Sequence, residues 1–132
     1  MLDSYVLGKV NRISPEAPVP IISLKKKENR IGGAGNVALN LKYLGAHPII
    51  ASVIGNDTEG QTLSDLFNKR GISTEGIVSS SNRKTTVKTR VISSKQQLLR
   101  IDSEDTHPLN SAHEMELLSK IESILKEPVD AI

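Results

Sequence analysis

Residues 48–54 form a nearly continuous apolar run of strand length, Pro48-Ile49-Ile50-Ala51-Ser52-Val53-Ile54. A strand with one face in water alternates apolar and polar residues, whereas a continuous apolar run is typical of a strand that is covered on both faces. Strands of that kind occur mainly in sheets with helices packed on both sides. The run therefore predicts an α/β fold.

Two predicted helices flank this run. The first has apolar residues at helical spacing, and Gly45 follows it as a stop; the stripe consists of Ala34, Val37, Ala38, Leu41 and Leu44. The second starts at Thr58, which has capping-box spacing to Gln61, and ends at Gly71. The order strand, helix, strand, helix with short connections is typical of an α/β sheet.

A third helix is predicted from Ser111, with Glu114 as its capping-box partner and Pro128 after its end. Its expected buried stripe is Met115, Leu118, Ile121 and Leu125. Residues 129–132 are apolar enough to begin a further buried strand.

Other strands are predicted at the start of the chain and in its second half. Residues 4–13 have the composition of an exposed or edge strand, and three prolines at 15, 18 and 20 exclude the next stretch from the middle of a sheet. Short strands are expected at 21–24 and 77–78. Residues 84–92 alternate between two faces, and residues 98–102 are expected to return as the partner strand.

Composition excludes several classes of protein. The chain has 132 residues, a net charge of +2, 2% aromatic residues and no cysteine, which predicts roughly one domain and no disulfide framework or thiolate metal site. It contains neither a run of ~20 apolar residues nor a signal-peptide pattern, so we expect a cytoplasmic protein without membrane contact. The near-neutral net charge does not indicate a basic surface for binding nucleic acid. The three histidines lack ligand spacing, and we expect no metal site.

The segment Gly32-Gly33-Ala34-Gly35-Asn36-Val37-Ala38 is the strongest candidate for chemistry. Gly33, Gly35 and Ala38 fit the dinucleotide fingerprint G-x-G-x-x-A, with Asp57 as the ribose acid. We reject that interpretation because the fingerprint must follow a buried apolar strand, and here Lys26 to Arg30 precede it. Amides of the first helical turn and the Asn36 side chain can still donate to hydroxyls or anions. A Gly-rich helix entry without a ligand explains the segment equally well.

Basic residues gather on one face of the predicted strand 84–92. Lys84, Lys88 and Arg90, with Arg100 across the turn, would place several cations on a small surface. A solvated sheet face accounts for them alone, but beside a hydroxyl-binding turn they suggest a phosphorylated polyol. Asp3, expected in a turn before the first strand, could accept hydrogen bonds from sugar hydroxyls or simply cap that turn.

Motifs along nearly the whole chain carry a resemblance to a known family. They are Met1-Leu2-Asp3-Ser4-Tyr5, Gly8, Arg12-Ile13-Ser14-Pro15-Glu16-Ala17-Pro18-Val19-Pro20, Gly32 to Ala38, Leu44-Gly45-Ala46, Gly55-Asn56-Asp57, Gly60, Thr85 to Arg90, and Gln96-Gln97-Leu98-Leu99-Arg100-Ile101-Asp102. Together they resemble the heptose-7-phosphate kinase branch of the ribokinase (phosphofructokinase B) family of carbohydrate kinases. The Gly-Gly-Ala-x-Asn turn marks the broad family, and residues 12–20 mark the heptose branch.

The resemblance implies a ribokinase-like α/β fold, with a partial Rossmann-like layered core and a small β-sheet lid. Residues 1–132 would be the amino-terminal part of one kinase domain, with lid strands near 4–24 and 77–102 and core near 31–71 and 110–132. It also implies phosphoryl transfer from Mg-ATP to the anomeric hydroxyl of heptose 7-phosphate, for ADP-heptose and lipopolysaccharide core synthesis. A homodimer through the lid strands is a further expectation.

Site residues follow from the resemblance position by position. It implies that Asp3, Gly32, Gly33 and Asn36 hold sugar hydroxyls, while chemistry suggests Lys88, Arg90 and Arg100 for the phosphate. The family's first strand with its Gly-Asp and the later Gly-Ala-Gly-Asp turn have no match here, so the catalytic Asp is expected beyond residue 132. The alternatives are a non-catalytic sugar-phosphate-binding or dimerisation module and another sugar kinase of this family.

Overall fold

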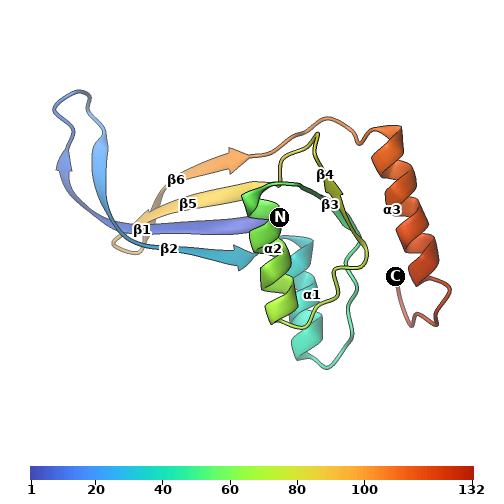
Figure 1. The fold of residues 1–132 in the computed structure, drawn as a ribbon. Helices are drawn as coiled ribbons and strands as arrows, with labels where there is room; N and C mark the ends of the chain where they lie inside the picture. The colour runs from blue at the N-terminus through green and yellow to red at the C-terminus, as the bar shows by residue number, and fades with distance from the viewer.

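A computed structural model describes residues 1–132 and shows a four-stranded sheet joined to a smaller α/β part (Figure 1). The sheet has the order β2-β1-β5-β6. Its strands are β1 (Leu2–Ile13), β2 (Pro20–Ile31), β5 (Val87–Ser93) and β6 (Gln96–Ser103). The β1–β2 hairpin extends well away from the helices, so only the other end of the sheet meets the rest of the molecule (Figure 1).

The first strand is central, which corrects the expectation of an exposed or edge strand. β1 pairs with β2 in antiparallel fashion and, over Leu2 to Gly8, with β5 in parallel fashion. The strand also begins earlier than expected, so Asp3 lies within it and not in a turn before it. Sequence alternation could not predict this, because β5 comes from more than eighty residues away. The prolines behave as expected, since Pro15 and Pro18 lie in the hairpin loop and Pro20 is the first residue of β2.

The register places two sets of side chains on opposite faces of the sheet, because neighbouring residues in a strand alternate. Asp3 is level with Lys88 and Arg30, and Tyr5 is level with Arg90 and Glu28. We call this the charged face. The reverse face carries the alternate residues, among them Leu2, Ser4, Val87 and Thr89.

The α/β part consists of α1 (Ala34–Tyr43), β3 (Ser52–Gly55), α2 (Thr58–Lys69) and β4 (Ile77–Ser80). β3 and β4 pair in parallel, so residues 77–80 belong here and not among the lid strands, where we had expected them. The apolar run at 48–54 is only partly a strand: residues 52–55 pair with β4, and Ile49 makes one isolated bridge to Ser73. Ile49 is also 45% exposed, since no element covers the start of the run on both sides.

Helices α1 and α2 end where the glycine stops predict. Gly45 and Gly71 have positive φ of 93° and 64°, a region that glycine enters without the steric cost of a Cβ. The start of α2 differs slightly from the expectation: Asp57 is the N-cap, and its side chain accepts from the Gly60 amide at 2.7 Å.

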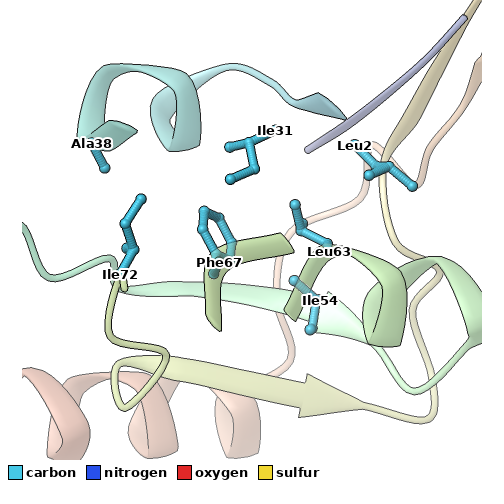
Figure 2. Close-up of a cluster of buried hydrophobic side chains, with 7 residues drawn as sticks. All are labelled: Leu2, Ile31, Ala38, Ile54, Leu63, Phe67 and Ile72. Carbon is cyan, nitrogen blue, oxygen red and sulfur yellow. The ribbon is translucent and has the colours of Figure 1, made fainter. Parts of the chain in front are cut away.

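The core lies where the inner end of the sheet meets α1, α2 and β3. Figure 2 shows its seven side chains, drawn from every one of these elements and the loop after α2: Leu2, Ile31, Ala38, Ile54, Leu63, Phe67 and Ile72. Apart from Phe67 the cluster is aliphatic, as the low aromatic content requires. The cluster fixes the inner ends of β1 and β2, and hence Asp3 and Gly32, relative to the helices.

Helix α3 (Ser111–Ile124) differs most from the sequence-based expectation. Its N-cap is Asn110, whose side chain accepts from the His113 amide at 2.8 Å, so the helix starts as expected with a different cap. None of its residues is buried, and Met115 and Leu118 are 65% and 51% exposed, because α3 packs mainly against the small β3–β4 sheet, along one side. Residues 129–132 form no strand, as no neighbouring strand pairs with them. No helix of the structure has both the length and the apolar character needed to cross a bilayer.

Candidate functional site

A cavity of about 480 Å³ lies between the β2 edge of the sheet and helices α1 and α2. Three of the predicted site residues, Asp3, Gly33 and Asn36, line it. The remaining lining residues come from β1, β2 and the two helices: Tyr5, Asn29, Arg30, Ile31, Leu39, Leu66 and Arg70. Polar and charged groups therefore converge on one hollow beside the glycine-rich turn.

The glycine-rich turn approaches Asp3 more closely than any other residue type would allow. A Cβ built on Gly32 would lie 2.7 Å from the Asp3 Cγ, which is closer than real Cβ contacts. Gly33 is the N-cap of α1 with a φ of 58°, and no side chain caps this helix. Free amides at a helix N-terminus can donate to an anion or a hydroxyl. The turn thus places backbone donors and the Asp3 carboxylate at the same wall of the cavity.

Asp3 is held by an ion pair across the sheet. The Arg90 Nη1 donates to Asp3 Oδ1 at 2.6 Å, and the Asp3 side chain is only 15% exposed. The hydrogen bond to Asp3 raises the pKa of Arg90 above its usual range, which outweighs the opposing effect of burial. Asp3 Oδ2 receives no hydrogen bond from the protein and remains available to accept one from a ligand.

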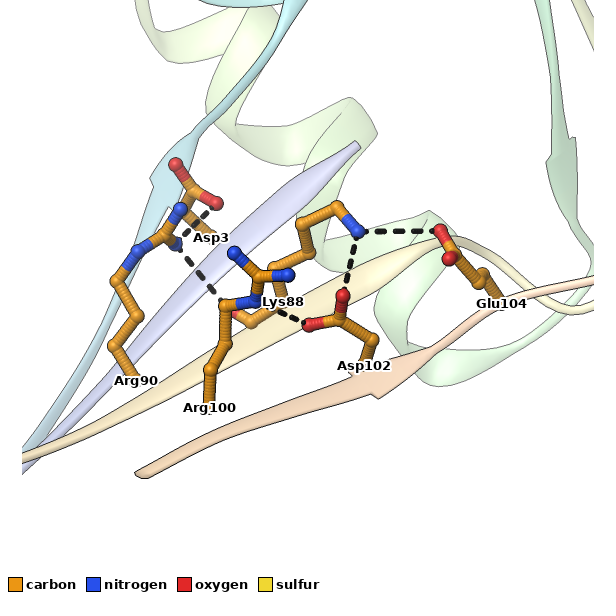
Figure 3. A network of polar contacts seen from close by, with 6 residues as sticks. All are labelled: Asp3, Lys88, Arg90, Arg100, Asp102 and Glu104. Atoms are coloured by element: carbon orange, nitrogen blue, oxygen red, sulfur yellow. Dashed lines mark hydrogen bonds and ion pairs between the residues drawn. The ribbon is translucent and has the colours of Figure 1, made fainter. Parts of the chain in front are cut away.

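None of the three cations predicted to bind phosphate lines the cavity, neither Arg90 nor Lys88 and Arg100. Lys88 and Arg100 take part in a separate set of ion pairs. Figure 3 shows them in a network with two carboxylates, Asp102 of β6 and Glu104, which directly follows β6. The Lys88 Nζ donates to Asp102 at 2.8 Å and Glu104 at 3.3 Å, and the Arg100 Nε donates to Asp102 at 2.9 Å. The hydrogen bond to Asp102 is the main reason why the pKa of Lys88 is raised, and the same contact lowers the pKa of Asp102.

This network contradicts the prediction that the basic residues form one cluster of unpaired cations on a strand face. The alternation of residues 84–92 predicts which side chains share a face, but it contains no information on the partner strand. In the structure Lys88 is level with Asp102, and Arg90 is bound to Asp3. Lys84 precedes β5, donates its amide to Asp105 and lies apart from this network. The four basic residues are therefore not one exposed cluster.

Sequence reasoning missed several residues of the cavity wall. Tyr5 could have been found, because it lies two residues after Asp3 and therefore on the same face of the strand. Arg30 is level with Asp3 through the β1–β2 register, and Arg70 reaches the cavity from the end of α2. No local pattern marks these two arginines, since only the tertiary arrangement brings them to Asp3.

A family model described as pfkB family carbohydrate kinase matches residues 3–127 of the chain. The chain belongs to this family. Curated relatives support the assignment: "Bifunctional protein HldE" of Pelobacter propionicus is 48% identical over 84% of the present chain, and that of Methylobacillus flagellatus is 45% identical over 100% of the present chain. The chain spans only 23% and 27% of these two relatives, about a quarter of their length.

Solved structures of sugar kinases show the same fold. A putative phosphofructokinase from Staphylococcus aureus superposes with a TM-score of 0.73 at 19% identity, covering 92% of this chain and 36% of that one. A fructokinase from Halothermothrix orenii gives 0.58 at 24% identity, covering 89% of this chain and 40% of that one. The α/β fold is therefore the ribokinase-like one that the resemblance implied.

Proposed function

We propose that the chain forms the sugar-binding part of an ATP-dependent carbohydrate kinase that phosphorylates heptose 7-phosphate at its anomeric hydroxyl. The observation that carries this proposal is the convergence of Asp3, Gly33 and Asn36 on one cavity, with Gly32 packed against Asp3. The HldE relatives, at 42% to 48% identity, favour a heptose phosphate over other sugars. ADP-heptose and lipopolysaccharide core synthesis is the corresponding process.

The geometry suggests how these residues bind a sugar. Asp3 accepts hydrogen bonds from adjacent hydroxyls through its free Oδ2, and charge-assisted bonds of this kind are stronger than neutral ones. The Asn36 amide can donate to one hydroxyl and accept from another. Arg90 keeps Asp3 oriented, and the amides at the α1 N-terminus complete the wall.

Phosphoryl transfer also requires a base for the attacking hydroxyl, ATP and a metal ion that neutralises the phosphates. One fold relative, a sugar kinase from Pyrococcus horikoshii, is described in complex with ATP. Within residues 1–132 no group of three or more His, Cys, Asp or Glu side chains is placed to hold a metal ion. We assign no residue of this chain to Mg²⁺, ATP or the catalytic base.

Replacing Asn36 by alanine is expected to weaken binding of heptose 7-phosphate by about tenfold, because a hydrogen bond to a polar ligand contributes on the order of 1 kcal/mol and Asn36 can make two. Isothermal titration calorimetry with the 132-residue chain measures this. Asn40→Ala is the matched control, since Asn40 lies one turn further along α1, is exposed and does not line the cavity. Equal affinity of Asn36→Ala and the unmodified chain would remove Asn36 from the site.

A non-catalytic module that dimerises through the sheet is the second candidate. Leu99 and Ile101 of β6 are 54% and 52% exposed on the reverse face, where Leu99 is level with Val91, and Val91 with Val6. An apolar surface of this kind suits a second copy of the chain. Under this proposal Leu99→Glu halves the mass measured by light scattering. A monomeric unmodified chain would exclude the dimer.

A further inference from the structure

Two arginines that the sequence did not single out, Arg30 and Arg70, line the same cavity as Asp3 and Asn36. They come from different elements, the end of β2 and the end of α2. Arginine holds phosphate through planar, two-pronged hydrogen bonds, so two arginines that line one cavity from different elements suit that group.

Arg30 is oriented by an aromatic ring. Its guanidinium carbon lies 4.6 Å from the centroid of the Tyr5 ring, and that of Arg90 lies 5.6 Å from the same centroid. Arg30 also pairs with Glu28, but Glu28 simultaneously pairs with Lys26 at 2.5 Å. One carboxylate therefore serves two cations, and a positive charge remains uncompensated beside the cavity.

Arg70 is oriented without a carboxylate. Its Nη1 donates to the Tyr43 hydroxyl at 2.6 Å, and it takes part in none of the ion pairs of the structure. It is the C-cap residue of α2, where the negative end of the helix dipole favours a cation. No carboxylate pairs with Arg70, so its guanidinium can bind an anion in the cavity.

The alternative cations are already neutralised. Lys88 and Arg100 face two carboxylates, Asp102 and Glu104, so this group has no net charge. A phosphate bound there would have to displace Asp102 from both partners. The uncompensated positive charge lies instead at Arg30 and Arg70.

We propose that Arg30 and Arg70 form an anion subsite that binds the phosphate of a sugar phosphate whose hydroxyls contact Asp3 and Asn36. This inference rests on the proposed function, because it assigns the charged end of that same substrate. The predicted phosphate site therefore changes from Lys88 and Arg100, on the β5 side of Asp3, to the β2 side, where Arg30 lies.

The test compares heptose 7-phosphate with the same heptose lacking phosphate, by calorimetry on the whole chain. Arg30→Gln and Arg70→Gln are each expected to weaken binding of the phosphorylated sugar by about tenfold or more, since a hydrogen bond to a charged group is worth more than a neutral one. Affinity for the unphosphorylated heptose should stay within about twofold of that of the unmodified chain. Unchanged affinity of both variants for the phosphorylated sugar overturns the proposal, as does an equal loss in Arg100→Gln.

Lys25→Gln and Lys69→Gln are the matched controls, because each removes one positive charge from an exposed residue that does not line the cavity. Lys25 lies on the same strand as Arg30, and Lys69 directly precedes Arg70. Both should bind like the unmodified chain, and circular dichroism melting checks that all variants fold. If the chain binds neither sugar, the proposed function fails, but inorganic phosphate still tests the subsite. Phosphorus NMR should then show binding that the Arg30→Gln, Arg70→Gln double variant lacks; no binding by the unmodified chain overturns the subsite.

Discussion

Phe67→Ala should lower the free energy of unfolding by about 3–5 kcal/mol, the cost of truncating a buried phenylalanine to alanine. Phe67 is 3% exposed and lies between α1 and α2 at the centre of the cluster in Figure 2. Gly35 approaches its ring so closely that a Cβ there would be 3.0 Å from the Phe67 Cζ. Removing the ring would therefore leave a cavity against the backbone of α1, which adds to the lost burial.

Urea denaturation followed by circular dichroism measures the effect. Leu44→Ala is the control, since Leu44 is 85% exposed and its truncation should change the free energy of unfolding by less than about 0.5 kcal/mol. A domain stability of about 5–15 kcal/mol is typical, so Phe67→Ala can leave a substantial unfolded population. A change of less than about 1 kcal/mol in Phe67→Ala would contradict the packing described here.

Asp57→Ala is expected to cost about 2–4 kcal/mol, because it removes a helix cap and two further hydrogen bonds to a charged group. The Asp57 carboxylate accepts from the Gly60 amide at 2.7 Å, the Thr85 amide at 2.8 Å and the Thr85 hydroxyl at 2.7 Å. Thr85 precedes β5, so this carboxylate ties the start of α2 to the chain that enters the sheet. Its loss should loosen the sheet relative to the helices as well as destabilise α2.

The stabilisation by Asp57 should depend on pH. Burial raises the pKa of Asp57, but the hydrogen bonds from Thr85 and Gly60 outweigh burial and hold the pKa below its ordinary value. A carboxyl whose folded pKa is depressed stabilises the fold above its unfolded pKa, about 3.9, and loses this contribution as the pH falls toward the folded value. The difference in unfolding free energy between the unmodified chain and Asp57→Asn should therefore be larger at pH 6 than at about pH 2.5.

Guanidinium denaturation at several pH values tests this. Asp65→Asn is the control: Asp65 lies on the exposed side of the same helix and accepts only from the Gln61 side chain. The difference in unfolding free energy between Asp65→Asn and the unmodified chain should hardly vary with pH. The role assigned to the Asp57 hydrogen bonds would be refuted by a pH-independent difference for Asp57→Asn.

Local patterns predicted the elements that depend on near neighbours. Helices α1 and α2, their glycine stops and the return of β6 after the turn at residues 94–95 all have causes within a few residues. The same is true of Gly32 to Asn36, where the need for backbone approach is visible in the glycines themselves. Asp3 and Asn36 were assigned to one site through the family resemblance, and the structure brings both to one cavity.

The expectations that failed depend on distant partners. β1 became a central strand because β5 pairs with it, and residues 77–80 joined β3 because a parallel partner lay there. The stripe on α3 remained exposed because only one side of the helix meets a small sheet. Periodicity shows which residues of an element share a face, but it cannot say what covers that face.

By itself, then, the sequence determined an α/β chain with a glycine-rich turn suited to hydroxyl or anion binding, and its motifs indicated the carbohydrate kinase family. Only the tertiary structure decided which cations face the cavity. The arrangement of the strands pairs Lys88 and Arg90 with carboxylates, whereas Arg30 and Arg70 line the cavity with positive charge that is not fully compensated. The reason is physical: charge balance depends on which side chains become neighbours across strands and helices, and that information is absent from any local stretch of sequence.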